Sequence, residues 1–237
     1  MNTRKFDLAA LDMAGTTVDE GGLVYQVLDA TIAATTGNPV PADVLARWKG
    51  TSKRDAIAGL LTDLGAAADH ATVERTYSDF TDRLVAAYRT TPPTPVAGVP
   101  EALADLRSAG VKVALQTGYS KPIAMAILDG LGWSIGESPT DTVDALITSD
   151  LVPASRPAPY LVFRCMEATG VTDVRRVLVA GDTPNDILAG HHAGAGLVVG
   201  VLSGSFDAQA LRVHPLTHLL PSLADVRPLL RPHTTAG

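Results

Sequence analysis

Three aspartates in two short segments carry the chemistry that this sequence suggests first. Asp12 follows the apolar stretch FDLAAL (6–11), and Asp182 and Asp186 lie in GDTPND (181–186). If a helix begins between Asp182 and Asp186, both face one point, where Asp12 supplies a third carboxylate. Carboxylates held this close repel each other unless a cation lies between them, and oxygen-only ligands suit Mg²⁺. The spacing predicts a magnesium site, although Asp182 taken alone is also a candidate N-cap.

Hydrogen-bond donors stand beside these carboxylates. Backbone N–H groups and hydroxyls are what a dianionic phosphoryl group needs, and Arg156 would add a charge-assisted hydrogen bond. We expect the Asp12 carboxylate to attack phosphorus, giving an aspartyl-phosphate that water then cleaves. The candidate donors are Gly15, Thr16 and Thr17 after the first apolar stretch and Thr117 and Gly118 after a second one, VKVALQ.

Short apolar stretches must position these residues. They do not alternate strictly between apolar and polar residues, which is typical of strands buried on both faces of a parallel sheet. In such sheets ligands bind at the carboxyl ends of the strands, where the candidate residues lie. The predicted strands are 6–11, 111–116, 144–148, 177–181 and 197–201.

Helical patterns alternate with the later strands. Several open with Pro in the first turn and close with Gly, as helices commonly do. Strand alternating with helix predicts an α/β fold with right-handed crossovers. The predicted helices are 100–110, 121–132, 157–170 and 184–196.

The segment 21–90 breaks this rhythm and predicts an all-helical insertion. It contains no convincing strand, and its longest helix candidate, 69–89, has an apolar and aromatic stripe at helical spacing that indicates core or a dimer contact. The proline-rich stretch 90–98 suits a linker back to the sheet. We therefore expect a core domain of residues 1–20 and 91–237 and a helical domain of 21–90.

The composition and charge of the chain limit the classes of molecule that we expect it to bind. The chain has 237 residues and a formal net charge of -6, and no stripe of Lys and Arg suits a phosphate backbone, so nucleic acid is not an expected partner. No apolar run is long enough to span a membrane, and the first residues lack a signal-peptide pattern, so we expect a cytoplasmic protein. The single cysteine, Cys165, lies in an apolar pattern typical of a buried free thiol.

Taken together and in this order, DMAGT, LQTGY, Arg156 and GDTPND resemble the motifs of the haloacid dehalogenase superfamily. The resemblance covers essentially the whole chain. It implies a Rossmann-like parallel-sheet core with an inserted all-helical C1 cap, here 21–90. It also implies that Asp12 is the nucleophile and that the backbone carbonyl of Ala14 joins the metal ligands.

Ala14 stands where most phosphatases of this superfamily have a second aspartate. That aspartate protonates the leaving oxygen and later activates water. The alanine side chain can do neither. Either the reaction needs no proton at that point or another group delivers it.

An AGT segment in this place is similar to the phosphonoacetaldehyde hydrolases, which cleave a carbon–phosphorus bond. No leaving oxygen needs a proton there, and a lysine that condenses with the aldehyde accepts the electrons left on carbon. Lys53, three residues after Gly50, matches that Schiff-base lysine. In a partly dry site its pKa would be lowered toward nucleophilic competence.

Other interpretations of this segment stay open. Lys53 could instead hold the distal group of a substrate, as basic residues do in other capped members, or be a solvated helix lysine. This sequence differs from the phosphonoacetaldehyde hydrolases at three positions. They usually have a histidine where Ala56 stands, and they tend to have a methionine at the position of Lys49 and a cysteine at the position of Gly22. Lys49 could lower the pKa of Lys53 or bind an anionic substrate tail. Tyr119 is a further candidate for the pocket.

Three functions follow, in order. The first is an Mg²⁺-dependent phosphonatase-like hydrolase acting on phosphonoacetaldehyde or a related small phosphonate. The second is a phosphatase for a small phosphate monoester, and the third is a non-catalytic binding protein, which would not need all three aspartates. A homodimer through the cap is implied by the resemblance alone, and the organic part of the substrate stays undetermined.

Overall fold

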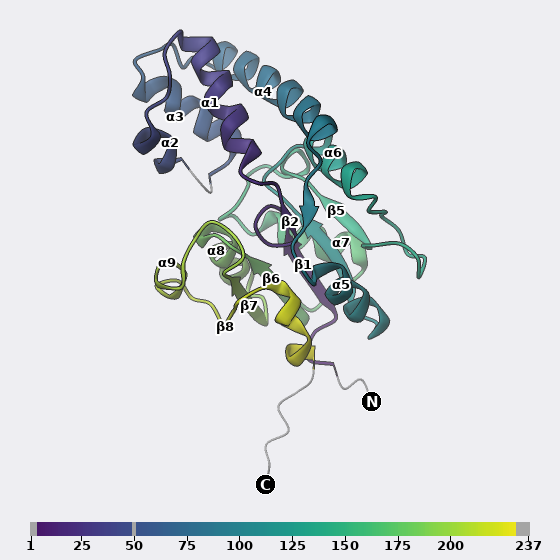
Figure 1. Ribbon diagram of the computed structural model, residues 1–237. Helices are drawn as coiled ribbons and strands as arrows, with labels where there is room; N and C mark the ends of the chain where they lie inside the picture. Colours follow the sequence, from purple (N-terminus) through teal and green to yellow (C-terminus); the bar gives the residue numbers. More distant parts are fainter. Residues whose placement is uncertain (1–3, 49–50, 231–237) are drawn as a thin grey trace.

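A computed structural model describes residues 4–48 and 51–230. Within these residues a six-stranded sheet has the order β5-β4-β1-β6-β7-β8, with every neighbouring pair parallel (Figure 1). This is the predicted α/β class with a parallel sheet. The strands are β1 (Leu8–Asp12), β4 (Lys112–Gln116), β5 (Ala145–Ile147), β6 (Val177–Gly181), β7 (Leu197–Val201) and β8 (His218–Leu220).

Both faces of the sheet are covered, which explains why the middle of each strand is apolar. Along β1, Leu8 and Ala10 pack into one hydrophobic cluster, whereas Ala9 and Leu11 pack into another. Since successive side chains of a strand point to opposite faces, each cluster marks one covered face. Helix α7 (Tyr160–Thr169) packs against β1, β4 and β5, α8 (Pro184–Ala193) packs against β6 and β7, and α5 (Val99–Ser108) packs against β4.

Four of the described helices of the sheet region match the predicted ones to within a few residues, whereas α9 (Ala208–Arg212) has no predicted counterpart. Proline stands in the first turn of three of them, and a glycine with positive φ follows three of them. The helices are α5 (Val99–Ser108), α6 (Lys121–Leu131), α7 (Tyr160–Thr169), α8 (Pro184–Ala193) and α9 (Ala208–Arg212), with short 3₁₀ helices η1 (Ser149–Leu151), η2 (Val174–Arg176) and η3 (Leu223–Leu230).

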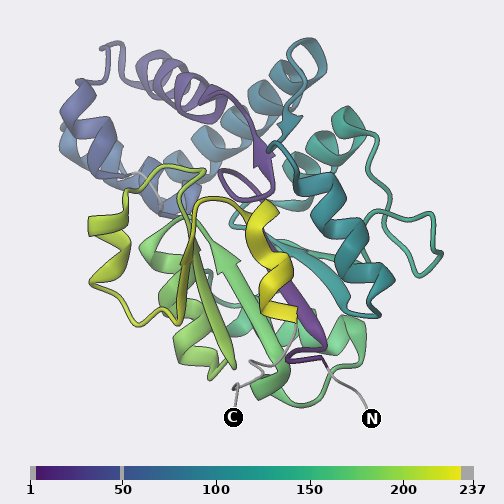
Figure 2. The ribbon, with the colours of Figure 1, turned by 60° about the horizontal axis from the view of Figure 1, so that its bottom comes forward.

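Among the described residues, four helices stand between β2 (Val18–Asp19) and β3 (Thr94–Pro95), and we call α1 to α4 the helical region. They are α1 (Leu23–Thr36), α2 (Ala42–Arg47), α3 (Lys53–Asp63) and α4 (His70–Thr90). The aromatic stripe of α4 is buried, as expected of core. Figure 2 shows this region, purple to blue, at one end of the sheet.

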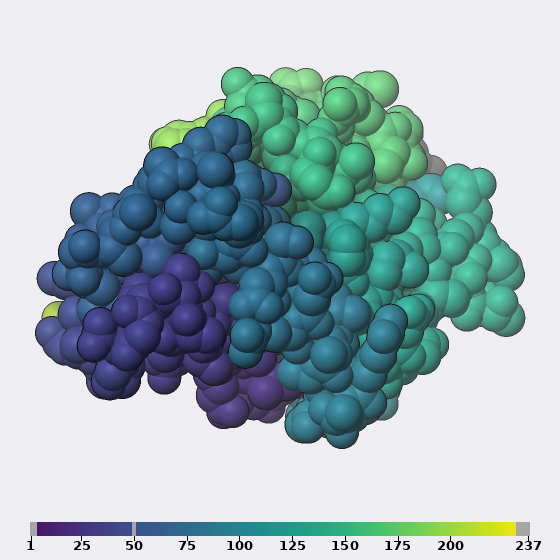
Figure 3. All heavy atoms as spheres, turned by 90° about the horizontal axis from the view of Figure 1, so that it is seen from above, coloured from purple at the N-terminus to yellow at the C-terminus, as the bar shows by residue number. Residues whose placement is uncertain are grey.

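The predicted linker 90–98 is wrong in part. Residues 94–95 form β3, which pairs antiparallel with β2, so the chain leaves and re-enters the core side by side. One hydrophobic cluster runs from Leu115 of the sheet to Ile57 and Phe80 of the helical region. From above, the blue atoms of the helical region lie directly against the teal and green ones (Figure 3). The division into two domains at 21–90 stays a prediction.

Two further findings concern single features. Cys165 is a buried free thiol, as predicted, and burial raises its pKa. Among the described residues, none of the helices combines the length and apolar character needed to span a bilayer.

Candidate active site

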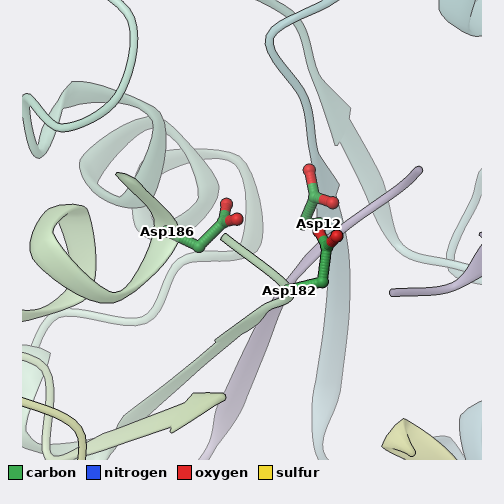
Figure 4. A group of neighbouring side chains, drawn as sticks. All are labelled: Asp12, Asp182 and Asp186. Atoms are coloured by element: carbon green, nitrogen blue, oxygen red, sulfur yellow. The ribbon is translucent and has the colours of Figure 1, made fainter. Parts of the chain in front are cut away.

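The three aspartates meet at the carboxyl ends of two adjacent strands. Asp12 ends β1, Asp182 directly follows β6, and Asp186 lies in the first turn of α8. Because β1 and β6 pair in parallel, with Leu11 opposite Ala180, their ends lie together. Carboxylate oxygens of all three lie within 4.8 Å of one another, and all three residues are buried (Figure 4).

The start of α8 turns Asp186 toward the other two. Thr183, not Asp182, is the N-cap, so the alternative prediction for Asp182 is wrong. The Thr183 N–H donates to Asp186 Oδ2 at 3.1 Å, and the Asp186 N–H donates back to Thr183 Oγ1 at 3.4 Å. This capping box frees the Asp182 carboxylate from helix capping.

Arg156 supplies positive charge to the cluster. Its Nη1 donates to Asp12 Oδ1 at 2.8 Å and also contacts Asp186 Oδ1. One guanidinium cannot neutralise three carboxylates. Burial, and then the charge of Asp12, raise the pKa of Asp182 to about 7.

The donor set fits a hard cation. Asp182 Oδ2 accepts the Ser205 N–H at 2.8 Å, whereas Asp182 Oδ1 is buried without a hydrogen-bond partner among the described residues. A cation would satisfy a buried carboxylate oxygen that has no hydrogen-bond partner in an acidic cluster. Oxygen-only ligands of this kind suit Mg²⁺ or a similar ion.

Two glycines let the backbone approach Asp182. A Cβ on Gly15, whose φ is +85°, would lie 2.5 Å from Asp182 Oδ2, and a Cβ on Gly204 would also collide with this carboxylate. Any larger residue at either position would displace the carboxylate. The Gly15 carbonyl also accepts a hydrogen bond from Ser203 Oγ at 2.8 Å, which ties the two loops together.

A cavity of about 260 Å³ lies between these strand ends and the helical region. It brings together most of the residues singled out in the sequence: Asp12, Ala14, Gly15, Lys53, Thr117, Gly118, Tyr119, Arg156 and Asp182. Thr16 is fully buried, and its hydroxyl has no hydrogen-bond partner among the described residues. Lys49 lies outside the described residues. The roles of all these residues stay predictions.

Thr117 is anchored at the end of β4. Its N–H donates to the Ile147 carbonyl at 3.0 Å, and its hydroxyl accepts the Tyr119 N–H at 3.1 Å. The hydroxyl proton is therefore free to point into the cavity. A threonine held in this way can donate to an anion without first being reoriented.

Lys53 is the first residue of α3, and its side chain is buried at the cavity. Nζ donates to the Thr51 carbonyl at 3.5 Å and lies 5.2 Å from the ring centroid of Tyr25 and 6.0 Å from that of Tyr119. Burial lowers its pKa, Glu20 opposes this shift, and Arg156 adds to it. The positive end of the α3 dipole also disfavours an ammonium here.

Neither alanine near the site carries an ionisable group. Ala14 lines the cavity, and its neighbour Gly15 donates to the Val18 carbonyl at 2.8 Å in the tight turn after β1. Ala56, where a histidine was expected from the resemblance, is fully buried in the hydrophobic cluster of α3. Any proton transfer must use other groups.

Sequence reasoning missed two parts of the cavity. Ser203, Gly204 and Ser205 line it after β7, and the rule that ligands bind at strand ends would have found them. Glu20 also lines it, held by the hydroxyls of Tyr88 and Tyr119. No spacing signals Glu20, because its partners are 68 and 99 residues away in the chain.

Comparisons with known proteins identify the family of this chain. Residues 6–194 match the haloacid dehalogenase-like hydrolase family. Over 214 residues the chain is 30% identical to the phosphonoacetaldehyde hydrolase of Bacillus cereus, covering 86% of this chain and 78% of that protein.

Solved structures share the fold. A phosphonoacetaldehyde hydrolase-like protein from Oleispira antarctica has a TM-score of 0.78 at 20% identity, covering 96% of this chain and 92% of that one. CbbY from Rhodobacter sphaeroides, solved in complex with phosphate, has a TM-score of 0.77 at 18% identity, covering 93% and 96%. With the family match over most of its length, the chain belongs to the haloacid dehalogenase-like hydrolase family and is an enzyme of that family.

Proposed function

We propose that this protein is an Mg²⁺-dependent phosphonatase-like hydrolase that cleaves the carbon–phosphorus bond of phosphonoacetaldehyde or a related small phosphonate. One observation carries the proposal: a buried lysine, Lys53, lines the same cavity as Asp12 and the donors around it. The similarity to the phosphonoacetaldehyde hydrolase of Bacillus cereus supports the same substrate class.

At phosphorus, the Asp12 carboxylate acts as nucleophile, and its attack gives an aspartyl-phosphate. Thr117, Gly118 and Arg156 bind the phosphoryl oxygens. The carboxylates of Asp12, Asp182 and Asp186 and the carbonyl of Ala14 would hold Mg²⁺, which supplies positive charge for the phosphoryl oxygens.

At carbon, the Lys53 amine condenses with the aldehyde and forms an iminium. When phosphorus transfers to Asp12, the electron pair of the carbon–phosphorus bond becomes the carbon–carbon double bond of an enamine, and the iminium nitrogen takes its π pair. No leaving oxygen needs a proton, which accounts for Ala14.

The cavity favours a small substrate. Its volume of about 260 Å³ lies below the ~300–1,000 Å³ of pockets that hold drug-sized ligands. Lys53, Tyr25 and Tyr119 surround the part where the organic half of the substrate would lie.

The alternative is a phosphatase for a small phosphate monoester, with Lys53 binding the distal group. Ala56 favours it, because the position expected to assist proton transfer at an imine is apolar and buried.

The homodimer through the helical region also stays a prediction, which sedimentation analysis tests.

Reductive trapping separates the two functions. The protein is incubated with phosphonoacetaldehyde, Mg²⁺ and borohydride, and the modified peptide is identified by mass spectrometry. An adduct on Lys53, and none on the exposed Lys121, supports carbon–phosphorus cleavage. Turnover of phosphate esters without any adduct would instead establish the phosphatase.

A further inference from the structure

A carboxyl group outside the predicted machinery lies in the same cavity as Lys53. Glu20 stands between β2 and α1, where the chain passes from the sheet to the helical region (Figure 1). The Tyr119 hydroxyl donates to its Oε1 and Oε2 at 2.9 and 3.0 Å, and the Tyr88 hydroxyl donates to Oε2. Two phenols, one from α4 and one from the loop after β4, therefore fix this carboxyl.

Tyr119 links Glu20 to the lysine. Its hydroxyl bonds to Glu20, while its ring faces Lys53 Nζ at 6.0 Å. Among the described residues no carboxylate forms a salt bridge with Lys53, whose Nζ contacts the Thr51 carbonyl. The Glu20 carboxyl and the Lys53 amine thus line the same cavity without forming a salt bridge with each other.

Apart from Asp12 and Asp182, which the proposed function uses at phosphorus and at the metal ion, several groups at or near the cavity are poor candidates for proton transfer. Ala14 and Ala56 have no ionisable side chain, and the Arg156 guanidinium does not deprotonate in proteins. Asp19 is exposed, and its carboxylate accepts the Gly21 N–H at 2.9 Å in the turn that precedes α1.

We propose that Glu20 is the general acid for imine formation at Lys53. This rests on the proposed function. The neutral amine adds to the carbonyl carbon and gives a carbinolamine. Glu20 then donates its proton to the carbinolamine hydroxyl, the carbon–oxygen bond breaks to release water, and the nitrogen lone pair forms the carbon–nitrogen double bond. The products are the iminium, water and the Glu20 carboxylate, which later takes a proton from the water that hydrolyses the imine.

The electrostatic surroundings suit this exchange. Burial raises the pKa of Glu20, and the nearby Asp12 adds to the shift, while Tyr88, Tyr119 and Lys53 oppose it. Burial lowers the pKa of Lys53. Both shifts increase the fraction of the protein that has an acid at Glu20 and a free amine at Lys53 near neutral pH.

The experiment measures the rate of imine formation with chemistry at phosphorus blocked. Asp12→Asn and the double variant Asp12→Asn/Glu20→Gln are mixed with phosphonoacetaldehyde, and borohydride is added after increasing times. We expect the adduct on Lys53 to form ~10²-fold or more slowly without the Glu20 carboxyl. The dependence of this rate on pH should also lose its decline toward high pH.

Controls separate catalysis from folding. Glu137→Gln, which changes an exposed glutamate, should leave the rate unchanged, and formate should restore part of the rate to Glu20→Ala in the Asp12→Asn background. Equal rates and equal pH profiles with and without Glu20 would overturn its role while leaving the Schiff base intact. Absence of any adduct in Asp12→Asn itself would overturn the Lys53 assignment and this proposal with it.

Discussion

Arg156 Nη1 lies 2.8 Å from Asp12 Oδ1, so the predicted nucleophile is paired with the residue predicted to bind the phosphoryl group. Both side chains are largely buried, which strengthens the interaction over that of a surface pair. An incoming phosphoryl group would share the same guanidinium. If Asp12 is the nucleophile, this pair would hold its oxygen beside the bound phosphoryl group before the substrate arrives.

Replacing Arg156 by alanine should therefore weaken both binding and chemistry. We expect kcat/KM for phosphate release to fall ~10²-fold or more, because a buried charge-assisted bond is lost and Asp12 loses its partner. Steady-state kinetics measures this. Arg164→Ala, which removes an exposed pair with Glu167, is the matched control. If Arg156→Ala kept the kinetics of the wild type, Arg156 would have no role in binding the phosphoryl group or in catalysis.

Replacing Asp12 by asparagine should abolish phosphate release while preserving the fold. The amide cannot attack phosphorus, so we expect a loss of roughly 10³-fold or more. Because one of three mutually repelling carboxylates is removed, the midpoint of thermal unfolding should not fall. Phosphate release at the wild-type rate would eliminate both enzymatic mechanisms.

Magnesium should stabilise the folded protein through the acidic cluster. At a concentration of 100 times its Kd, a ligand that binds only the folded state adds about 2.7 kcal/mol to the free energy of unfolding. We expect Mg²⁺ to raise the unfolding temperature of the wild type and not of Asp182→Asn, as measured by calorimetry with and without chelator. An equal shift in the variant would place the ion elsewhere.

The stabilisation of the folded protein by Mg²⁺ should depend on pH. Burial and Asp12 raise the folded-state pKa of Asp182 from 3.8 to about 7. Without metal, this carboxyl makes stability fall as pH rises from about 4 to 7, since only the folded state retains its proton. Mg²⁺ must displace that proton at pH 6 but not at pH 8. The stabilisation by Mg²⁺ should therefore be larger at pH 8.

Gly204 provides a test of the cavity wall that sequence reasoning overlooked. A Cβ at this position would collide with the Asp182 carboxylate. Gly204→Ala should therefore weaken the stabilisation by Mg²⁺ and lower phosphate release together. Ser222→Ala, in the turn before η3, is a control that should change neither. If Gly204→Ala responds to Mg²⁺ as the wild type does, the Asp182 carboxylate can move away from the added Cβ and still bind the ion.

The sheet and the cluster of three aspartates could be predicted from the sequence because their signals are local. A buried parallel strand is a continuous apolar run, and its end is marked by the residues that follow, as at Asp12 and Asp182. β8 was missed because His218–Leu220 is short and only half-buried. The antiparallel pair of β2 and β3 was missed since a two-residue strand beside proline leaves no pattern.

The environment of Lys53 could not be predicted in the same way. Glu20, Tyr88 and Tyr119 meet only because the helical region packs over the strand ends, and no spacing along the chain records that contact. Burial of Lys53 likewise depends on this packing. Residues at the ends of neighbouring parallel strands, such as Asp12 and Asp182, can be brought together from the sequence, whereas contacts between the helical region and the strand ends cannot.

Replacing Lys53 by methionine should raise stability while removing the adduct. Methionine keeps much of the side-chain volume without a buried charge, so we expect the free energy of unfolding to increase by roughly 1–2 kcal/mol at pH 7. Urea unfolding measures it. Lys121→Met is the matched control, because Lys121 is also the first residue of its helix but is exposed.

The sign of the pH dependence follows from the direction of the shift. Burial lowers the folded-state pKa of Lys53 below its usual 10.5. At pH values where the Lys53 amine is protonated in both the folded and the unfolded state, burial of its charge lowers the stability of the wild type in full. As pH rises from the folded pKa toward 10.5, the folded state loses its proton first and that cost declines. The advantage of Lys53→Met should therefore shrink at alkaline pH. A variant less stable than the wild type at pH 7 would mean that the attraction of Lys53 to Glu20 outweighs the cost of burial.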